Sequence, residues 1–165
     1  MKSYEQILRY AMQMELNGHN FFKENAKKFN DPTSEALFIK LAKIEMEHYN
    51  YLERQLNSYI KTKSFDISEE VMNREEDIFE ARAEAENIEA TLQESDIPDL
   101  TILRMAYLIE KDYKEFYTNA AENADDENIK AIFNKLASWE EGHEEIFKTE
   151  YDRRMKEYMT LPWGG

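Results

Sequence analysis

Residues 36–52 read ALFIKLAKIEMEHYNYL, and residues 131–147 read AIFNKLASWEEGHEEIF. In each stretch, apolar residues recur at helical spacing, and a glutamate is followed three residues later by a histidine. These pairs are Glu45 with His48 and Glu140 with His143. Residues three apart on a helix project from the same side. Both pairs fall on the apolar side of their helices, so we expect all four side chains to point into the interior of a helical protein.

The two stretches belong to a longer internal repeat, in which residues 7–52 match residues 102–147 without gaps. In the upstream half of each repeat, Glu15 matches Glu110, and both glutamates interrupt an apolar stripe. The repeat therefore places two further carboxylates on inward faces. The alternative is a chance similarity between two helical pairs of like composition. Other matched positions include Leu8-Arg9 with Leu103-Arg104, Phe21 with Phe116, and Lys40-Leu41-Ala42 with Lys135-Leu136-Ala137.

Long stretches without a breaker favour helices throughout the chain. It contains only 4 Gly and 3 Pro, and its uninterrupted stretches are rich in good helix formers. Turn and capping residues at positions 30–34 and at Asp125-Asp126 divide each repeat into two helices. The predicted helices run from about Tyr4 to Phe29, from the first turn to Lys61, from Asp99 to Ala124, and from the second turn to Met159.

The short turns predict two antiparallel hairpins, which a long crossover at about residues 57–98 connects. Within the crossover, the stretch from Glu75 to Glu94 has the pattern of a further helix. A bundle of four helices with one long crossover is the ferritin-like topology. The sequence therefore predicts an all-α, ferritin-like four-helix bundle, with residues 1–165 as a single domain.

The composition argues against several classes of function. A net charge of −14 disfavours binding to nucleic acid, whose phosphates attract Lys and Arg, and to an anionic membrane surface. The chain has no cysteine, so these residues provide no disulfide, Cys-ligated zinc site or iron–sulfur site. The first residues lack the apolar run of a signal peptide, and no stretch approaches the roughly 20 apolar residues that span a bilayer. We expect a soluble, cytoplasmic protein.

The inward glutamates and histidines together indicate a metal site. Four ionised carboxylates in a dry core cost several kcal/mol each, and two divalent cations would remove most of that cost. Carboxylate together with imidazole suits iron, manganese or zinc. The alternative is a set of core residues with raised pKa values or salt bridges. The predicted metal ligands are Glu15, Glu45, His48, Glu110, Glu140 and His143.

In these residues the chain resembles the di-iron domain of the rubrerythrin family, in the ferritin-like superfamily. The resemblance covers the four helices of the two repeats, which is most of the chain. It implies a pair of iron ions. It also implies that Glu45 and Glu140 bridge the metals, that Glu15 and His48 complete one metal site, and that Glu110 and His143 complete the other.

Other positions near these ligands are also informative. Tyr117 follows Glu110 by seven residues, where the family tends to place a tyrosine. We consider it a candidate catalytic residue with a redox role, and aromatic core packing is the alternative. The family usually carries another glutamate where Tyr113 stands, and Gly18 is the equivalent residue of the first repeat. This departure predicts that no carboxylate replaces a histidine on oxidation. The third histidine, His19, is expected beside the site or at the surface.

The resemblance implies an oxidoreductase that reduces hydrogen peroxide or consumes oxygen. Classical members of the family carry a Cys-x-x-Cys rubredoxin module that supplies electrons, so a chain without cysteine needs an external electron-donor protein. Two other functions stay open, namely ferroxidase activity with iron storage and a helical interaction module without catalysis. Abundant Tyr, Phe and Met suit a dimer face as well as a core, and we expect a homodimer.

Overall fold

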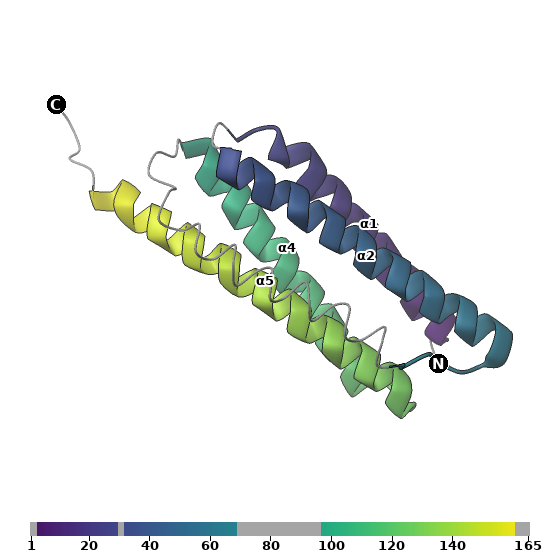
Figure 1. Ribbon diagram of the computed structural model, residues 1–165. Helices are drawn as coiled ribbons and strands as arrows, with labels where there is room; N and C mark the ends of the chain where they lie inside the picture. Colours follow the sequence, from purple (N-terminus) through teal and green to yellow (C-terminus); the bar gives the residue numbers. More distant parts are fainter. Residues whose placement is uncertain (1–2, 30–31, 69–96, 161–165) are drawn as a thin grey trace.

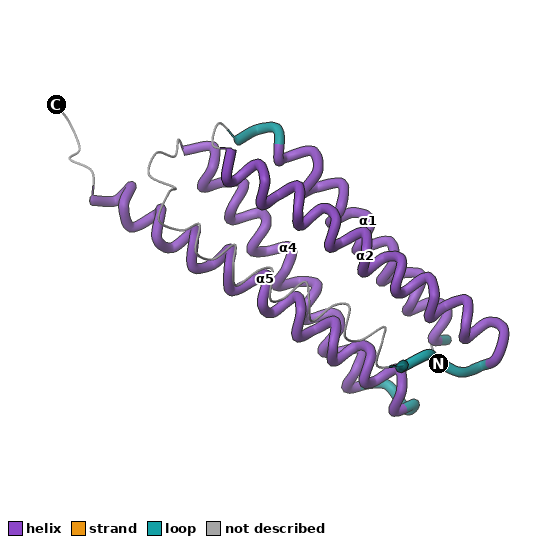
Figure 2. The backbone as a smooth tube through the Cα atoms, viewed as in Figure 1, coloured by secondary structure: helices purple, strands orange, loops and turns teal. Residues whose placement is uncertain are grey.

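The computed structural model describes residues 3–29, 32–68 and 97–160. This part of the chain is almost entirely helical, and it contains no strand (Figure 2). Four long helices run side by side, with α1 and α2 forming one hairpin and α4 and α5 forming the other (Figure 1). This arrangement confirms the predicted all-α, ferritin-like four-helix bundle. The helices are α1 (Tyr4–Ala26), α2 (Pro32–Thr62), α4 (Ile97–Glu122) and α5 (Glu127–Thr160).

The first helix is shorter than predicted. α1 ends at Ala26, whereas the apolar pattern suggested that it continues to Phe29. The chain tightens at this end, because Lys28 N donates to Asn25 O at 3.0 Å across three residues instead of four. Phe29 is still buried, and its ring centroid lies 4.7 Å from that of Phe38. Phe29 therefore continues the apolar pattern of the helix without being part of it.

The other boundaries agree with the sequence to within two residues. α2 ends at Thr62 instead of Lys61, and α5 ends at Thr160 instead of Met159. α4 begins at Ile97 and ends at Glu122, two residues earlier at each end than predicted. The helix predicted from Glu75 to Glu94 lies outside the described residues. Among the described helices, none is both long and apolar enough to cross a membrane.

The turn between α4 and α5 is fixed by capping and by a contact with the first hairpin. Asp126 Oδ1 accepts hydrogen bonds from Asn128 N at 2.8 Å and Ile129 N at 3.2 Å, which makes Asp126 the N-cap of α5. The hydroxyl of Tyr4 accepts hydrogen bonds from Asp125 N and Asp126 N, both at 3.0 Å. The start of α1 is thereby tied to the turn of the second hairpin.

Buried apolar side chains form two clusters that lie toward opposite ends of the bundle. Fully burying one such side chain contributes about 1.5–3 kcal/mol to stability, so both clusters hold the helices together. Along each of the four helices, the inward glutamate falls between the residues of one cluster and those of the other. The polar layer is thus closed at both ends by apolar packing. Leu8, Leu52, Tyr117 and Phe133 belong to one cluster, and Phe22, Phe38, Leu103 and Phe147 to the other.

Candidate metal centre

Six ionisable side chains meet in the layer between the two apolar clusters. They are the six that the sequence predicted as metal ligands, and each is at most 1% exposed. Every helix contributes to the layer, because the repeat places a glutamate or a Glu-x-x-His pair on each inward face. α1 provides Glu15, α2 provides Glu45 and His48, α4 provides Glu110, and α5 provides Glu140 and His143.

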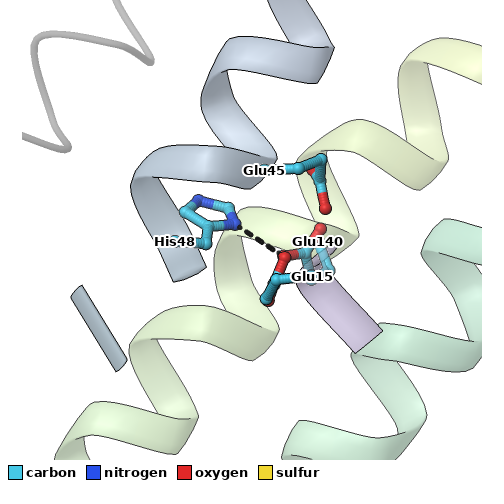
Figure 3. A group of neighbouring side chains, drawn as sticks. All are labelled: Glu15, Glu45, His48 and Glu140. Atoms are coloured by element: carbon cyan, nitrogen blue, oxygen red, sulfur yellow. Dashed lines mark ion pairs between the residues drawn. The ribbon is translucent and has the colours of Figure 1, made fainter. Parts of the chain in front are cut away.

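These side chains form two overlapping groups that can each hold a metal ion. In each group, one ligand atom from every residue lies within 4.8 Å of the others. Glu45 and Glu140 belong to both groups, and Figure 3 shows them facing Glu15 and His48. Geometrically, Glu45 and Glu140 are therefore the shared residues of a paired site. The first group consists of Glu15, Glu45, His48 and Glu140, and the second of Glu45, Glu110, Glu140 and His143.

Both imidazoles direct their Nδ1 atoms at the carboxylates. His48 Nδ1 lies 3.1 Å from Glu140 Oε1 and 3.4 Å from Glu15 Oε2. His143 Nδ1 lies 3.0 Å from Glu140 Oε2 and 3.2 Å from Glu110 Oε2. The two rings are nearly parallel, with centroids 6.0 Å apart. Glu140 thus offers one oxygen to each histidine, and the layer has the approximate two-fold arrangement of the sequence repeat.

The crowding of carboxylates changes the protonation of the layer. Burial raises the pKa of Glu45 well above its usual value, and the nearby charges of Glu140, Glu110 and Glu15 raise it further. Burial alone lowers the pKa of His48, but the charges of Glu15 and Glu140 outweigh this effect and raise it well above the usual value. Without cations, the layer therefore favours binding protons.

The donors fit a pair of divalent cations. Both carboxylate oxygens of Glu45 are buried, and neither has a hydrogen-bond partner among the residues that the structure describes. Buried polar groups are normally satisfied, so oxygens of this kind indicate a missing cationic partner. The four glutamates carry −4 when ionised, which two divalent ions balance. Oxygen and imidazole donors suit iron, manganese or zinc, as the sequence predicted.

Tyr117 forms a hydrogen bond to this layer from α4, which its repeat counterpart Phe22 cannot do because it has no hydroxyl. The Tyr117 hydroxyl donates a hydrogen bond to Glu15 Oε1, and the side chain is fully buried. Burial, followed by the charge of Glu15, raises the pKa of the phenol well above its usual value, so the phenol keeps its proton. Phe22, the equivalent residue of α1, instead stacks on Phe147 with ring centroids 5.7 Å apart. Tyr117 is therefore both a core residue and a neighbour of the site, and its catalytic role stays a prediction.

Tyr113 and Gly18, which occupy equivalent positions in the repeat, contact each other. A Cβ at Gly18 would lie 2.9 Å from Glu45 Oε2 and 3.1 Å from Tyr113 Cε2. The Tyr113 hydroxyl donates a hydrogen bond to Met14 O at 2.5 Å. Burial, and then the charge of Glu45, raises the pKa of Tyr113 above its usual value. Gly18 thus makes room for a neutral phenol and a site carboxylate at once.

Two further residues near the site complete its surroundings. His19 lies outside both groups, and its Nδ1 is 2.6 Å from Ala42 O of α2. Trp139 is buried and stacks on His48, with ring centroids 5.2 Å apart at an angle of 15°. Trp139 was not among the residues that the sequence pattern predicted near the site. It directly precedes Glu140 and replaces Ile44 of the first repeat, and that change at an inward position was the available signal.

Comparison with known proteins identifies one match. A family model described as Rubrerythrin matches residues 6–151. This range includes most of both hairpins and all six side chains of the layer. No curated protein and no solved structure matches the chain.

Proposed function

Because the chain belongs to the rubrerythrin family, we propose that it is a di-iron oxidoreductase that reduces hydrogen peroxide, with oxygen as the alternative oxidant. One observation carries this proposal, namely the two buried Glu and His groups that share Glu45 and Glu140. Two adjacent ions would suit a substrate with two oxygen atoms.

We assign the ligands by their membership of the two groups. Glu45 and Glu140 would bridge the ions, because each belongs to both groups. Glu15 with His48 would complete one metal site, and Glu110 with His143 the other. Manganese or zinc suits the same donors, but only a metal that changes oxidation state supports the proposed reaction.

When bound, two ferrous ions would supply one electron each for cleavage of the O–O bond. The chain's own residues exclude water from this chemistry, since all six side chains are buried between apolar clusters. Tyr117 holds Glu15 through its hydroxyl, and Trp139 packs flat against His48. These contacts fix the orientations of one carboxylate and one imidazole. The chain has no cysteine, so the electrons that restore the reduced state would come from an external donor protein.

The proposal is tested with protein that is purified without oxygen and reconstituted with Fe(II). Metal analysis should give two ions per chain, and stopped-flow absorption should show faster oxidation by hydrogen peroxide than by oxygen. His48→Ala should lose metal. His19→Ala is the matched control and should retain it, because His19 lies outside both groups.

Three outcomes would contradict the proposal. At most one ion per chain under saturating Fe(II) would exclude a paired site. Faster oxidation by oxygen, together with a large multi-subunit shell, would favour iron storage. Failure to bind any metal would leave a helical interaction module.

A further inference from the structure

The buried layer raises the question of how a substrate reaches it. Its six side chains are at most 1% exposed, so an incoming molecule must displace another residue. Where α2 meets α5, Trp139 covers His48 and is itself only 1% exposed. Where α1 meets α4, the covering residue is Tyr113, which is only partly buried. Of these two covers, Tyr113 is the one that reaches the surface.

Tyr113 is held in place by α1 at two points. Its hydroxyl donates a hydrogen bond to Met14 O, and its ring edge lies against Gly18. The carboxylate of Glu45 lies against the same side of Gly18, where a Cβ would be 2.9 Å from Oε2 and 3.1 Å from Tyr113 Cε2. The partly exposed Tyr113 ring and the fully buried Glu45 carboxylate therefore both lie against Gly18.

We propose that Tyr113 determines which oxidants enter, admitting hydrogen peroxide or oxygen and excluding hydroperoxides with an alkyl group. This inference rests on the proposed function and narrows its substrate class. On one side of the entrance is the backbone of α1 at Gly18, which cannot move without breaking helical hydrogen bonds. The width of the opening is then set by how far the Tyr113 ring tilts, and the hydrogen bond to Met14 O together with the packing of the ring restrains that tilt.

The size of the space supports discrimination against larger molecules. At Gly18 even one added methyl group would contact both Glu45 and Tyr113, so the closed form has no spare volume there. In this proposal a small tilt of the ring is enough to admit a molecule with two heavy atoms, such as hydrogen peroxide or oxygen. A branched alkyl group needs the ring to leave its position altogether, which also removes its packing against the core.

The test uses full-length protein and three variants. Tyr113→Phe keeps the ring and removes the hydrogen bond to Met14, and Tyr113→Leu removes the ring but keeps an apolar side chain. The control is Tyr107→Leu, because Tyr107 is a partly buried tyrosine of the same helix that packs against the other apolar cluster. Two quantities are measured. The first is the rate at which azide binds to the Co(II)-loaded protein, followed by visible absorption. The second is the ratio of Fe(II) oxidation rates with tert-butyl hydroperoxide and with hydrogen peroxide.

We expect Tyr113→Phe to speed azide binding by about fivefold, which corresponds to one hydrogen bond of about 1 kcal/mol. Tyr113→Leu should raise the rate ratio of the two hydroperoxides by about tenfold or more, the scale of steric discrimination in a pocket. Tyr107→Leu should change neither quantity.

Unchanged azide binding in both Tyr113 variants, or an unchanged hydroperoxide ratio in Tyr113→Leu, would overturn the proposal. If no variant is oxidised by any hydroperoxide, the proposed function fails instead. The azide rates alone then decide whether Tyr113 covers the entrance.

Discussion

Glu45 and Glu140 occupy equivalent positions in the two repeats, and each faces both histidine-containing groups. A carboxylate that contacts two ions contributes to the binding of both, whereas one that contacts a single ion contributes to the binding of that ion alone. At the scale of single residues, the four glutamates should therefore differ in their contribution to metal binding, although all four are equally buried.

We predict that Glu45→Ala and Glu140→Ala reduce metal binding more than Glu15→Ala or Glu110→Ala. Removing a shared carboxylate should lower the affinity for both ions. The loss should exceed the roughly 10–100-fold that is typical of removing a hydrogen-bond partner of a ligand. The terminal carboxylates should mainly affect one of the two ions. Titration of metal-free protein with Co(II), followed by visible absorption, measures both affinities. Equal losses in all four variants would contradict the assignment of Glu45 and Glu140 as bridges.

Gly18 provides a second test at this scale. Gly18→Ala should gain less stability in the metal-free protein than the roughly 1 kcal/mol that alanine adds as the better helix former, because the added Cβ also crowds Glu45 and Tyr113. It should nevertheless bind metal about tenfold more weakly, since the added Cβ would lie 2.9 Å from Glu45 Oε2 and force that carboxylate to move. Thermal unfolding and Co(II) titration measure the two effects.

Gly142→Ala is the matched control for this substitution, because Gly142 is a partly buried glycine within α5. It should gain helix stability without displacing Glu45. If Gly18→Ala binds metal as tightly as the unsubstituted chain, the absence of a side chain at Gly18 is not needed to position the Glu45 carboxylate.

At the scale of helices, the far end of α5 is attached to the start of α2 by a hydrogen bond from Arg154, which also forms a buried ion pair within α5. Arg154 Nε donates to Glu150 Oε1 at 2.6 Å, and Arg154 Nη2 donates to Ser34 Oγ at 3.4 Å. Arg154 and Glu150 are 3% and 7% exposed. Arg153 also pairs with Glu150, but its side chain is 31% exposed. Arg153 and Arg154 thus pair with the same glutamate, but the side chain of Arg154 is buried and that of Arg153 is partly exposed.

We predict that Arg154→Met lowers the free energy of unfolding by about 3 kcal/mol, because it weakens the compensation of a buried charge. Arg153→Met should cost about 1 kcal/mol or less, as expected for a more exposed pair. Urea unfolding monitored by circular dichroism gives both values. Similar losses in the two variants would show that burial does not distinguish these ion pairs.

The helices also show which features of the fold and the site could be predicted from the sequence alone. The Glu-x-x-His pairs lie on inward faces because the helical period fixes which residues share a side, and this information is entirely local. The end of α1 was missed, because Phe29 keeps the apolar pattern after the helix has stopped. The contact between Tyr113 and Gly18 was also missed. It depends on how closely α1 and α4 approach, which the pattern within one helix does not specify.

The stacking of Trp139 on His48 is a similar case at the junction of α2 and α5. The repeat indicated that Trp139 replaces an isoleucine at an inward position. It did not indicate which side chain of the opposite helix the indole would face. Pairings between helices depend on packing of the whole bundle, and only the structure identifies them.

For the molecule as a whole, the buried layer couples folding to protons and metal. The chain carries a net charge of −14, and four of its carboxylates lie at the centre of the fold. The pKa values of Glu45 and His48 are both raised above their ordinary values of 4.5 and 6.5. Both groups therefore bind a proton more tightly in the folded protein than in the unfolded chain. Divalent cations would compete for the same atoms.

This coupling predicts opposite effects of pH with and without metal. A raised pKa contributes stability that is complete below the unfolded value and is lost as the pH rises through the folded value. We therefore expect the melting temperature of metal-free protein to fall as the pH rises above 4.5, the ordinary pKa of a glutamate, because Glu45 and His48 lose their protons. The increase in melting temperature on adding Co(II) should grow over the same range, because fewer protons then compete with the metal. Differential scanning calorimetry measures both trends.

Surface repulsion in this acidic chain acts in the same direction, so Glu45→Gln is the control. It retains the surface charge and should flatten the metal-free profile. A metal-free melting temperature that stays constant or rises with pH would show that the buried layer does not control the pH dependence.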